Sequence, residues 1–166
     1  CSNPANEFPA ALTTSTANPF RIRLSSEIRS VISCVAAKTP LLRSAVLDEI
    51  TGATVLLKAE VLQRTGSFKF RGAYNKLSST PPARRAGAVV AYSSGNHAQG
   101  VAAAAQLLAM PAVIVMPQDA PKPKRERTAA LGAEVVLYDR EREDRSAIPR
   151  GSAERRGGVL VPPFDD

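Results

Sequence analysis

The sequence is poor in the residues on which several common kinds of site depend. It has no tryptophan, 5% aromatic residues, one histidine and two cysteines, Cys1 and Cys34. Two cysteines cannot build the disulfide framework of a small secreted domain, and such sparse use of cysteine favours a reducing compartment. A single histidine argues against a zinc site of the usual kind. We therefore expect a cytoplasmic protein without a metal centre.

A secretory leader and a membrane-spanning run are also lacking. The first 20 residues have no basic start and no sustained apolar core, so they do not predict a signal peptide. The longest apolar run, residues 100–117, approaches the length of a membrane span, but Gln106 and Pro111 interrupt it. An alanine-rich helix followed by a strand explains this run better. We expect no membrane association.

Positive charge is in excess but is not concentrated in one block. Lys and Arg number 22 against 15 Asp and Glu, which gives a net charge of +7. This balance suits an anionic partner, either nucleic acid or a small phosphorylated or carboxylated ligand. From residue 122 to 156, however, acidic residues alternate with basic ones, which is typical of solvated helix faces. We therefore expect a small anionic ligand rather than nucleic acid.

The second half of the chain alternates between apolar strands and helical segments. Strands are predicted at residues 87–92, 112–116, 133–138 and 158–162, and helices at 97–109, 121–131 and 142–155. Each segment between two strands is long enough, at about 20 residues, for a crossover between parallel strands. Near-continuous apolar strands are typical of a sheet that is covered on both faces. The pattern predicts an α/β fold, an open parallel sheet with helices on both faces.

The first half is less regular. Residues 1–24 read as an irregular arm and are followed by a short helix over Ser25–Ala37. A strand is predicted at residues 53–60, and a helix over 68–77 that Thr65 or Ser67 could cap. Residues 79–85, "STPPARR", resemble a linker. These observations divide the chain into 1–38, 39–86 and 87–166.

The stretch "AYSSGNHAQG" (91–100) follows a predicted strand and opens a helix. Ser93, Ser94, Gly95 and Asn96 are small, polar and uncharged, so their backbone amides could hold an anion at the carboxyl end of the sheet. His97 would lie at the start of the helix, where the dipole disfavours its protonation. An ordinary capped turn would have the same composition, and that alternative stays open.

The stretch "QRTGSFKFRGA" (63–73) sets an amine in an unusual place. Lys69 would lie in the first turn of a helix, where the dipole opposes a cation. Arg71 adds like-charge repulsion, and Phe68 and Phe70 could remove water. All three effects would lower the pKa of the amine and favour its nucleophilic form. The alternative is a lysine whose head simply reaches solvent.

Together these stretches resemble a known family. "KAEVLQRTGSFKFRGA", "SSGNHAQGVA", "VIVMPQDAPKPKRERTAALGAEVVLYDR" and "VPPFDD" are similar, in this order, to pyridoxal-phosphate-dependent threonine/serine dehydratases and serine racemases of fold type II. The similarity runs from about Thr39 to Asp166. It implies that Lys69 holds pyridoxal 5'-phosphate as a Schiff base, that Phe68 packs beside the cofactor ring and that Asn96 hydrogen-bonds its phenolic oxygen. It also implies a loop that receives the substrate carboxylate, made of Ser93, Ser94, Gly95, Asn96 and His97.

The implied reaction is a β-elimination that converts L-threonine or L-serine into a 2-oxo acid and ammonia. Lys69 is implied as the base that takes the Cα proton. The serine in "SSGNH" resembles that of serine racemases, in which it is the acid/base on the opposite face, so Ser94 admits racemisation. Serine racemase and 3-hydroxyaspartate dehydratase are therefore the alternative activities.

By the same resemblance the chain corresponds to the N-terminal part of such an enzyme. Residues 39–86 would be the incomplete large cofactor domain that carries Lys69, and residues 87–166 the small α/β/α domain that carries the substrate loop. The glycine-rich loop that cradles the cofactor phosphate would follow Asp166, and the intact enzyme is expected to be a homo-oligomer. We therefore expect a fragment or a truncated gene product. An expectation of another class is a non-catalytic α/β domain that binds an anion or an intact paralogue.

Overall fold

The computed structural model describes residues 31–144 and 147–163. The irregular arm predicted for residues 1–24 lies outside these residues. The first six residues of the helix predicted over Ser25–Ala37 lie outside them too, and of its described residues 31–33 are helical. Within the described residues, no helix is long and apolar enough to cross a membrane.

Four parallel strands form the central sheet. In chain order they are β3 (Val89–Tyr92), β4 (Ala112–Pro117), β5 (Glu134–Tyr138) and β6 (Val159–Val161), and their order in the sheet is β5-β4-β3-β6. Val90 of β3 is paired with Val113 on one side and Leu160 on the other. The two central strands are almost entirely buried, as expected of parallel strands covered on both faces. The predicted parallel sheet is confirmed.

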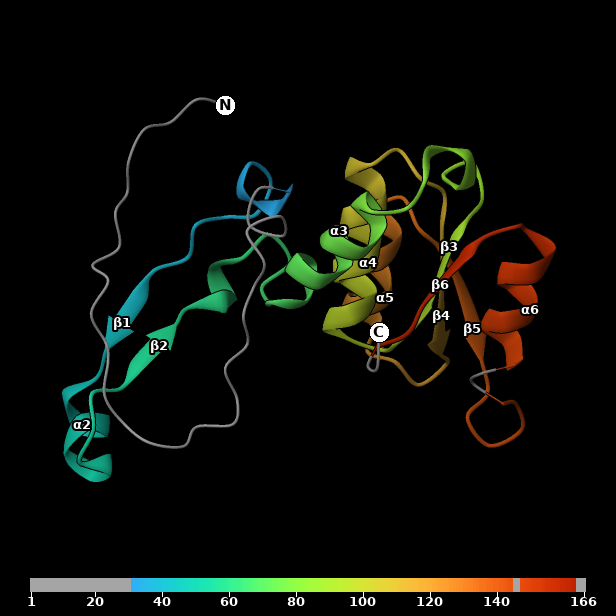
Figure 1. Cartoon of the computed structure of the whole chain (residues 1–166). Coiled ribbons are helices and arrows are strands. Elements are labelled where there is room, and N and C mark those ends of the chain that lie inside the picture. Colours follow the sequence, from blue (N-terminus) through green and yellow to red (C-terminus); the bar gives the residue numbers. More distant parts are fainter. Residues whose placement is uncertain (1–30, 145–146, 164–166) are drawn as a thin grey trace.

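Helices cover both faces of this sheet (Figure 1), which confirms the predicted layers. One face carries α3 (Lys69–Ser78), α4 (Asn96–Leu107) and α5 (Lys122–Ala130), and the other carries α6 (Ala147–Arg155). Alternation along β3 explains the two layers, because successive side chains of a strand point to opposite faces. Val89 packs with α3 and α4, whereas Val90 packs with Ala153 of α6.

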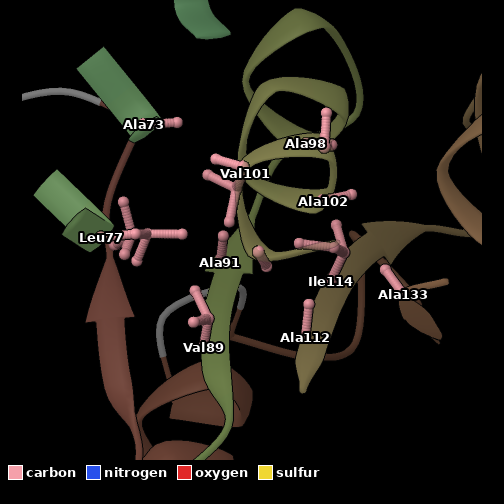
Figure 2. Packing of buried hydrophobic residues seen from close by; sticks show 14 of the residues in the cluster. Ala73, Leu77, Val89, Ala91, Ala98, Val101, Ala102, Ala112, Ile114 and Ala133 are labelled. Carbon is pink, nitrogen blue, oxygen red and sulfur yellow. The ribbon is translucent and has the colours of Figure 1, made fainter. Parts of the chain in front are cut away.

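The larger apolar cluster joins α3 to α4 and the sheet. Figure 2 shows Ala73 and Leu77 of α3 facing Val101 of α4, with Ala91 of β3 beside them. Helix α4 is rich in alanine, and its small side chains let it lie close to both neighbours. Because α3 shares this cluster with the sheet, the position of its first residue, Lys69, is set by the core. The division predicted after residue 86 stays a prediction.

A small antiparallel element precedes α3. It consists of β1 (Leu41–Arg43), α2 (Ala45–Thr51) and β2 (Leu56–Lys58), and it lies apart from the parallel sheet (Figure 1). The strand predicted at residues 53–60 is thus shorter than expected, and β1 and α2 were not predicted. Ser44 caps α2 by accepting a hydrogen bond from the Leu47 amide at 3.3 Å. Two single 3-10 turns, η1 (Glu60–Leu62) and η2 (Pro82–Arg84), flank α3.

Candidate active site

Lys69 lies in the first turn of α3, as predicted, and is its first residue, but the predicted cap is wrong. The residue before it, Phe68, already has helical angles (φ −63°, ψ −16°), and no side chain caps this end of the helix. A capping side chain needs an extended residue at that position. The Thr65 and Ser67 hydroxyls are instead buried without a hydrogen-bond partner in the described part of the chain.

Helical spacing divides α3 into an apolar face and a cleft face. Phe70, Ala73 and Leu77 are buried in the core cluster, and Ala73 also borders the cleft. Lys69, Gly72 and Lys76 are spaced by three and four residues, so they share a face, and all three line a cleft of about 480 Å³. The helical period thus turns the amine of Lys69 away from the core and toward open space.

The opposite wall of the cleft comes from α4 and the end of β6. It is formed by His97, Val161, Pro162 and Pro163. The Lys69 amine donates a hydrogen bond to the Pro163 carbonyl oxygen at 2.8 Å. His97 Nε2 lies 3.1 Å from the Val161 carbonyl oxygen, and since a carbonyl can only accept, Nε2 carries the hydrogen. The cleft therefore brings together Lys69 and His97, two of the residues predicted from the sequence.

The two phenylalanines beside Lys69 differ in their surroundings. Phe68 is 60% exposed and lines the cleft, with its ring centroid 5.5 Å from the Lys69 nitrogen. Phe70 is fully buried and packs against Tyr74. The prediction that both rings shield the amine from water is therefore wrong, because side chains two positions apart on a helical backbone point to nearly opposite sides. Only Phe68 presents a flat surface beside the amine.

Arg71 forms an ion pair with Glu60 on the side of α3 away from the cleft. Its Nε and Nη2 each lie 2.9 Å from a carboxylate oxygen of Glu60, and Thr39 donates to the same carboxylate at 2.6 Å. The hydrogen bond from Arg71 is the main cause that lowers the pKa of Glu60, against the opposing effect of burial. The positive charge of Arg71, which is close to Lys69 in the sequence, is thus neutralised by the Glu60 carboxylate. No local pattern predicts this pair, because its members come from separate elements.

Gly100 of α4 sets how closely the first turn of α3 approaches α4. A β-carbon at this position would lie 3.0 Å from the Lys69 carbonyl carbon and 3.1 Å from the Phe70 nitrogen. Both distances are shorter than ordinary contacts, so the two helices approach so closely only because residue 100 has no side chain. Gly100 is the last residue of the stretch "AYSSGNHAQG" (91–100), but its structural role was not predicted from the sequence.

The loop from residue 93 to 97 links β3 to α4, as predicted. The Ser93 amide donates to the Val115 carbonyl at 3.1 Å, and the Gly95 amide donates to the Ser93 hydroxyl at 3.3 Å. Ser94 is half-buried and Asn96 is exposed at the first position of α4. Of the loop residues, His97 lines the cleft beside Lys69, whereas Ser93, Ser94, Gly95 and Asn96 do not.

These residues fit the reactive end of the predicted cofactor. An aldehyde requires an accessible amine, and Lys69 offers one at the edge of an open cleft with a flat aromatic ring at its side. The described residues contain no cluster of three His, Cys, Asp or Glu side chains that could hold a metal. The chemistry that the cleft offers is that of an accessible amine, with His97 of the predicted substrate loop in the same cleft.

Comparisons with known proteins show the family of this chain. A family model described as pyridoxal-phosphate dependent enzyme matches residues 32–166. An L-threo-3-hydroxyaspartate ammonia-lyase from a Pseudomonas species is 58% identical over 130 residues, which cover 78% of this chain and 41% of the relative. An L-threonine ammonia-lyase from Thermotoga maritima is 46% identical over 140 residues, which cover 84% of this chain and 35% of the relative.

A solved structure of maize serine racemase matches 84% of this chain and 43% of its own, with a TM-score of 0.78 and 34% identity. This chain therefore spans about two fifths of the length of the relatives it matches. The predicted fold type and the family resemblance are both confirmed. The chain with Lys69 at the edge of its cleft belongs to the family of pyridoxal-phosphate dependent enzymes, and the predicted cofactor is the one on which that family depends.

Proposed function

We propose that this chain carries the lysine and the substrate loop of an ammonia-lyase that converts a small β-hydroxy amino acid into a 2-oxo acid and ammonia. The observation that carries the proposal is the position of Lys69, whose amine enters a cleft that also contains His97 of the predicted substrate loop. The family membership supports it.

Lys69, Phe68 and Asn96 are the residues that would hold the cofactor. Pyridoxal phosphate, when bound, supplies an electron sink that makes the Cα proton of a bound amino acid acidic. Lys69 Nζ then serves as the base that takes this proton. Its hydrogen bond to the Pro163 carbonyl orients the nitrogen at the edge of the cleft.

The loop from Ser93 to His97 would bind the carboxylate of the substrate. It is uncharged and lies at the N-terminus of α4, where backbone amides and the helix dipole favour an anion. Holding the carboxylate orients the Cα–H bond and the β-hydroxyl. Loss of that hydroxyl as water, followed by hydrolysis, gives the 2-oxo acid and ammonia without any net oxidation.

L-Threonine and L-serine are the substrates that the motifs favour, with 3-hydroxyaspartate as a further candidate. The ammonia-lyases from Thermotoga maritima and Pseudomonas named above carry two of these substrates in their names. All three substrates share the α-carboxylate and the β-hydroxyl on which the proposed steps depend.

Serine racemisation is the second candidate, and Ser94 is the observation that favours it. Racemisation needs an acid/base group on each face of Cα, and Ser94 would be the partner of Lys69. Its half-buried position in the loop supports such a role, as does the similarity to maize serine racemase.

The proposal is tested by incubating the full chain with pyridoxal phosphate and each of the three substrates in turn. Release of ammonia and a 2-oxo acid, abolished by Lys69→Ala, is the expected result. With L-serine as the substrate, the racemase activity would be added if D-serine forms in the wild type and not in Ser94→Ala, while 2-oxo acid formation persists in the variant. A chain that neither binds the cofactor nor forms product would overturn the proposal in favour of a non-catalytic domain.

A further inference from the structure

The ammonium of Lys124 lies beside the loop that begins α4. Lys124 is in the first turn of α5, and its nitrogen is 3.6 Å from the position that a β-carbon on Gly95 would take. Gly95 is the middle residue of the Ser93–His97 loop. A full positive charge therefore stands next to a loop that has no charged side chain other than an ionisable histidine.

The charge on Lys124 is not balanced by any residue that the structure describes. Its ammonium forms no ion pair or hydrogen bond with those residues, although the side chain is half-buried. The acidic residues nearest to Lys124 in the sequence already have partners: Glu126 pairs with Lys122 at 3.7 Å, and Asp119 pairs with Arg140 at 2.8 Å. A partly desolvated cation without a partner is costly, and an anion at the loop would relieve that cost.

We propose that Lys124 is a substrate-binding residue, whose ammonium attracts and holds the carboxylate received by the Ser93–His97 loop. This inference rests on the proposed function, because Lys124 would supply the positive charge for the substrate carboxylate that the Ser93–His97 loop itself lacks. A helix N-terminus supplies about half a unit of positive charge. Lys124 adds a whole unit at the same place.

The neighbouring Lys122 provides a matched control. It is the first residue of α5 and so lies in the same turn, is exposed, and forms an ion pair with Glu126. Replacing either lysine by glutamine removes one positive charge from the same helix. Only the change at Lys124 removes a charge that faces Gly95.

The experiment uses the full chain labelled with ¹⁵N and acetate as the probe, with chloride holding the ionic strength constant. The amide signals of Ser94, Gly95 and Asn96 are followed during the titration. We expect a saturable shift in the wild type and in Lys122→Gln. In Lys124→Gln the apparent dissociation constant should rise about threefold to tenfold. Lys124→Arg should stay close to the wild type.

Equal affinity in Lys124→Gln and the wild type, or equal losses in both glutamine variants, would overturn the inference. A wild-type loop whose amides do not respond to acetate would overturn it as well. Covalent capture of the cofactor by Lys69, measured on the same samples, shows separately whether the proposed function fails. Capture with an unresponsive loop would remove the role of Lys124 alone.

Discussion

The side chains near Lys69 lie either in the cleft or in an ion-pair network on the opposite side of α3. Arg71, two residues after Lys69, contacts Glu60, the Thr39 hydroxyl and the Ala37 carbonyl. The pair is largely enclosed, with 27% of the Arg71 side chain and 17% of the Glu60 side chain exposed. This network fixes the first turn of α3, and hence Lys69, to the chain that precedes it.

Glu60→Gln should lower the free energy of unfolding by about 1–3 kcal/mol, because it removes the charge that partners Arg71. Glu134→Gln is the matched control, since Glu134 forms a similar two-point contact with Arg156 but both side chains are about half exposed. That change should cost about 0.5 kcal/mol or less. Urea unfolding at neutral pH measures both, and equal losses would contradict the role of the enclosed pair.

The same pair predicts a pH dependence. Because the pKa of Glu60 is lowered from the ordinary value of 4.5 by the hydrogen bond from Arg71, its contribution is present above that value and is lost as the pH falls through the lower folded-state pKa. The stability difference between the wild type and Glu60→Gln should therefore shrink below about pH 4.5. A difference that stays constant or grows on acidification would refute this account.

At the level of elements, the packing of α3 against α4 sets the position of the site. Gly100→Ala would bring a methyl group to within 3.0–3.1 Å of the backbone of Lys69 and Phe70. We expect a loss of about 1–3 kcal/mol in the free energy of unfolding, because backbone atoms cannot move aside as a flexible side chain can. Gly72→Ala is the control in α3, where nothing lies within 4 Å of the new methyl group. It should be neutral or stabilise by up to about 1 kcal/mol. An unchanged free energy of unfolding in Gly100→Ala would show that α3 can shift.

The elements of the parallel sheet were predictable because their burial leaves a strong pattern. Apolar runs such as Val113–Val115 are covered on both faces, and turns and helices separate them. The segment from Leu41 to Lys58 has no buried residue in its strands or helix, so it has no comparable pattern, and β1 and α2 were missed. Exposed structure of this kind depends on local caps such as Ser44.

The site was predictable in its residues but not in its geometry. Residue types and spacing made Lys69 and the Ser93–His97 loop candidates but left a solvent-reaching lysine and an ordinary capped turn open, and the family resemblance favoured the site. The wall formed by Val161 and Pro163, the contact at Gly100 and the Glu60–Arg71 pair join segments that are distant in the sequence. Contacts of this kind have no local periodicity, so only the folded chain shows them.

At the scale of the whole molecule, α3 and the sheet share one apolar cluster, whereas the β1–α2–β2 segment lies outside it. We therefore expect limited trypsin digestion to cut first, among the described residues, after Arg43 and after Lys58, and to leave a resistant fragment from α3 through β6. Mass spectrometry of the fragments checks this. Early cuts at Arg84 or Arg85, which release α3, would instead support two separate units divided after residue 86.

The central claim is that Lys69 is the amine that binds the cofactor, and reductive trapping tests it most directly. The full chain is incubated with pyridoxal phosphate, reduced with borohydride and digested, and the modified peptide is identified by mass spectrometry. Lys76→Ala is the control, because Lys76 lines the same cleft on the same helix. The account predicts a visible absorption band and a single reduced adduct on Lys69, retained in Lys76→Ala and lost in Lys69→Ala. An adduct spread over other lysines, or one that persists in Lys69→Ala, would contradict it.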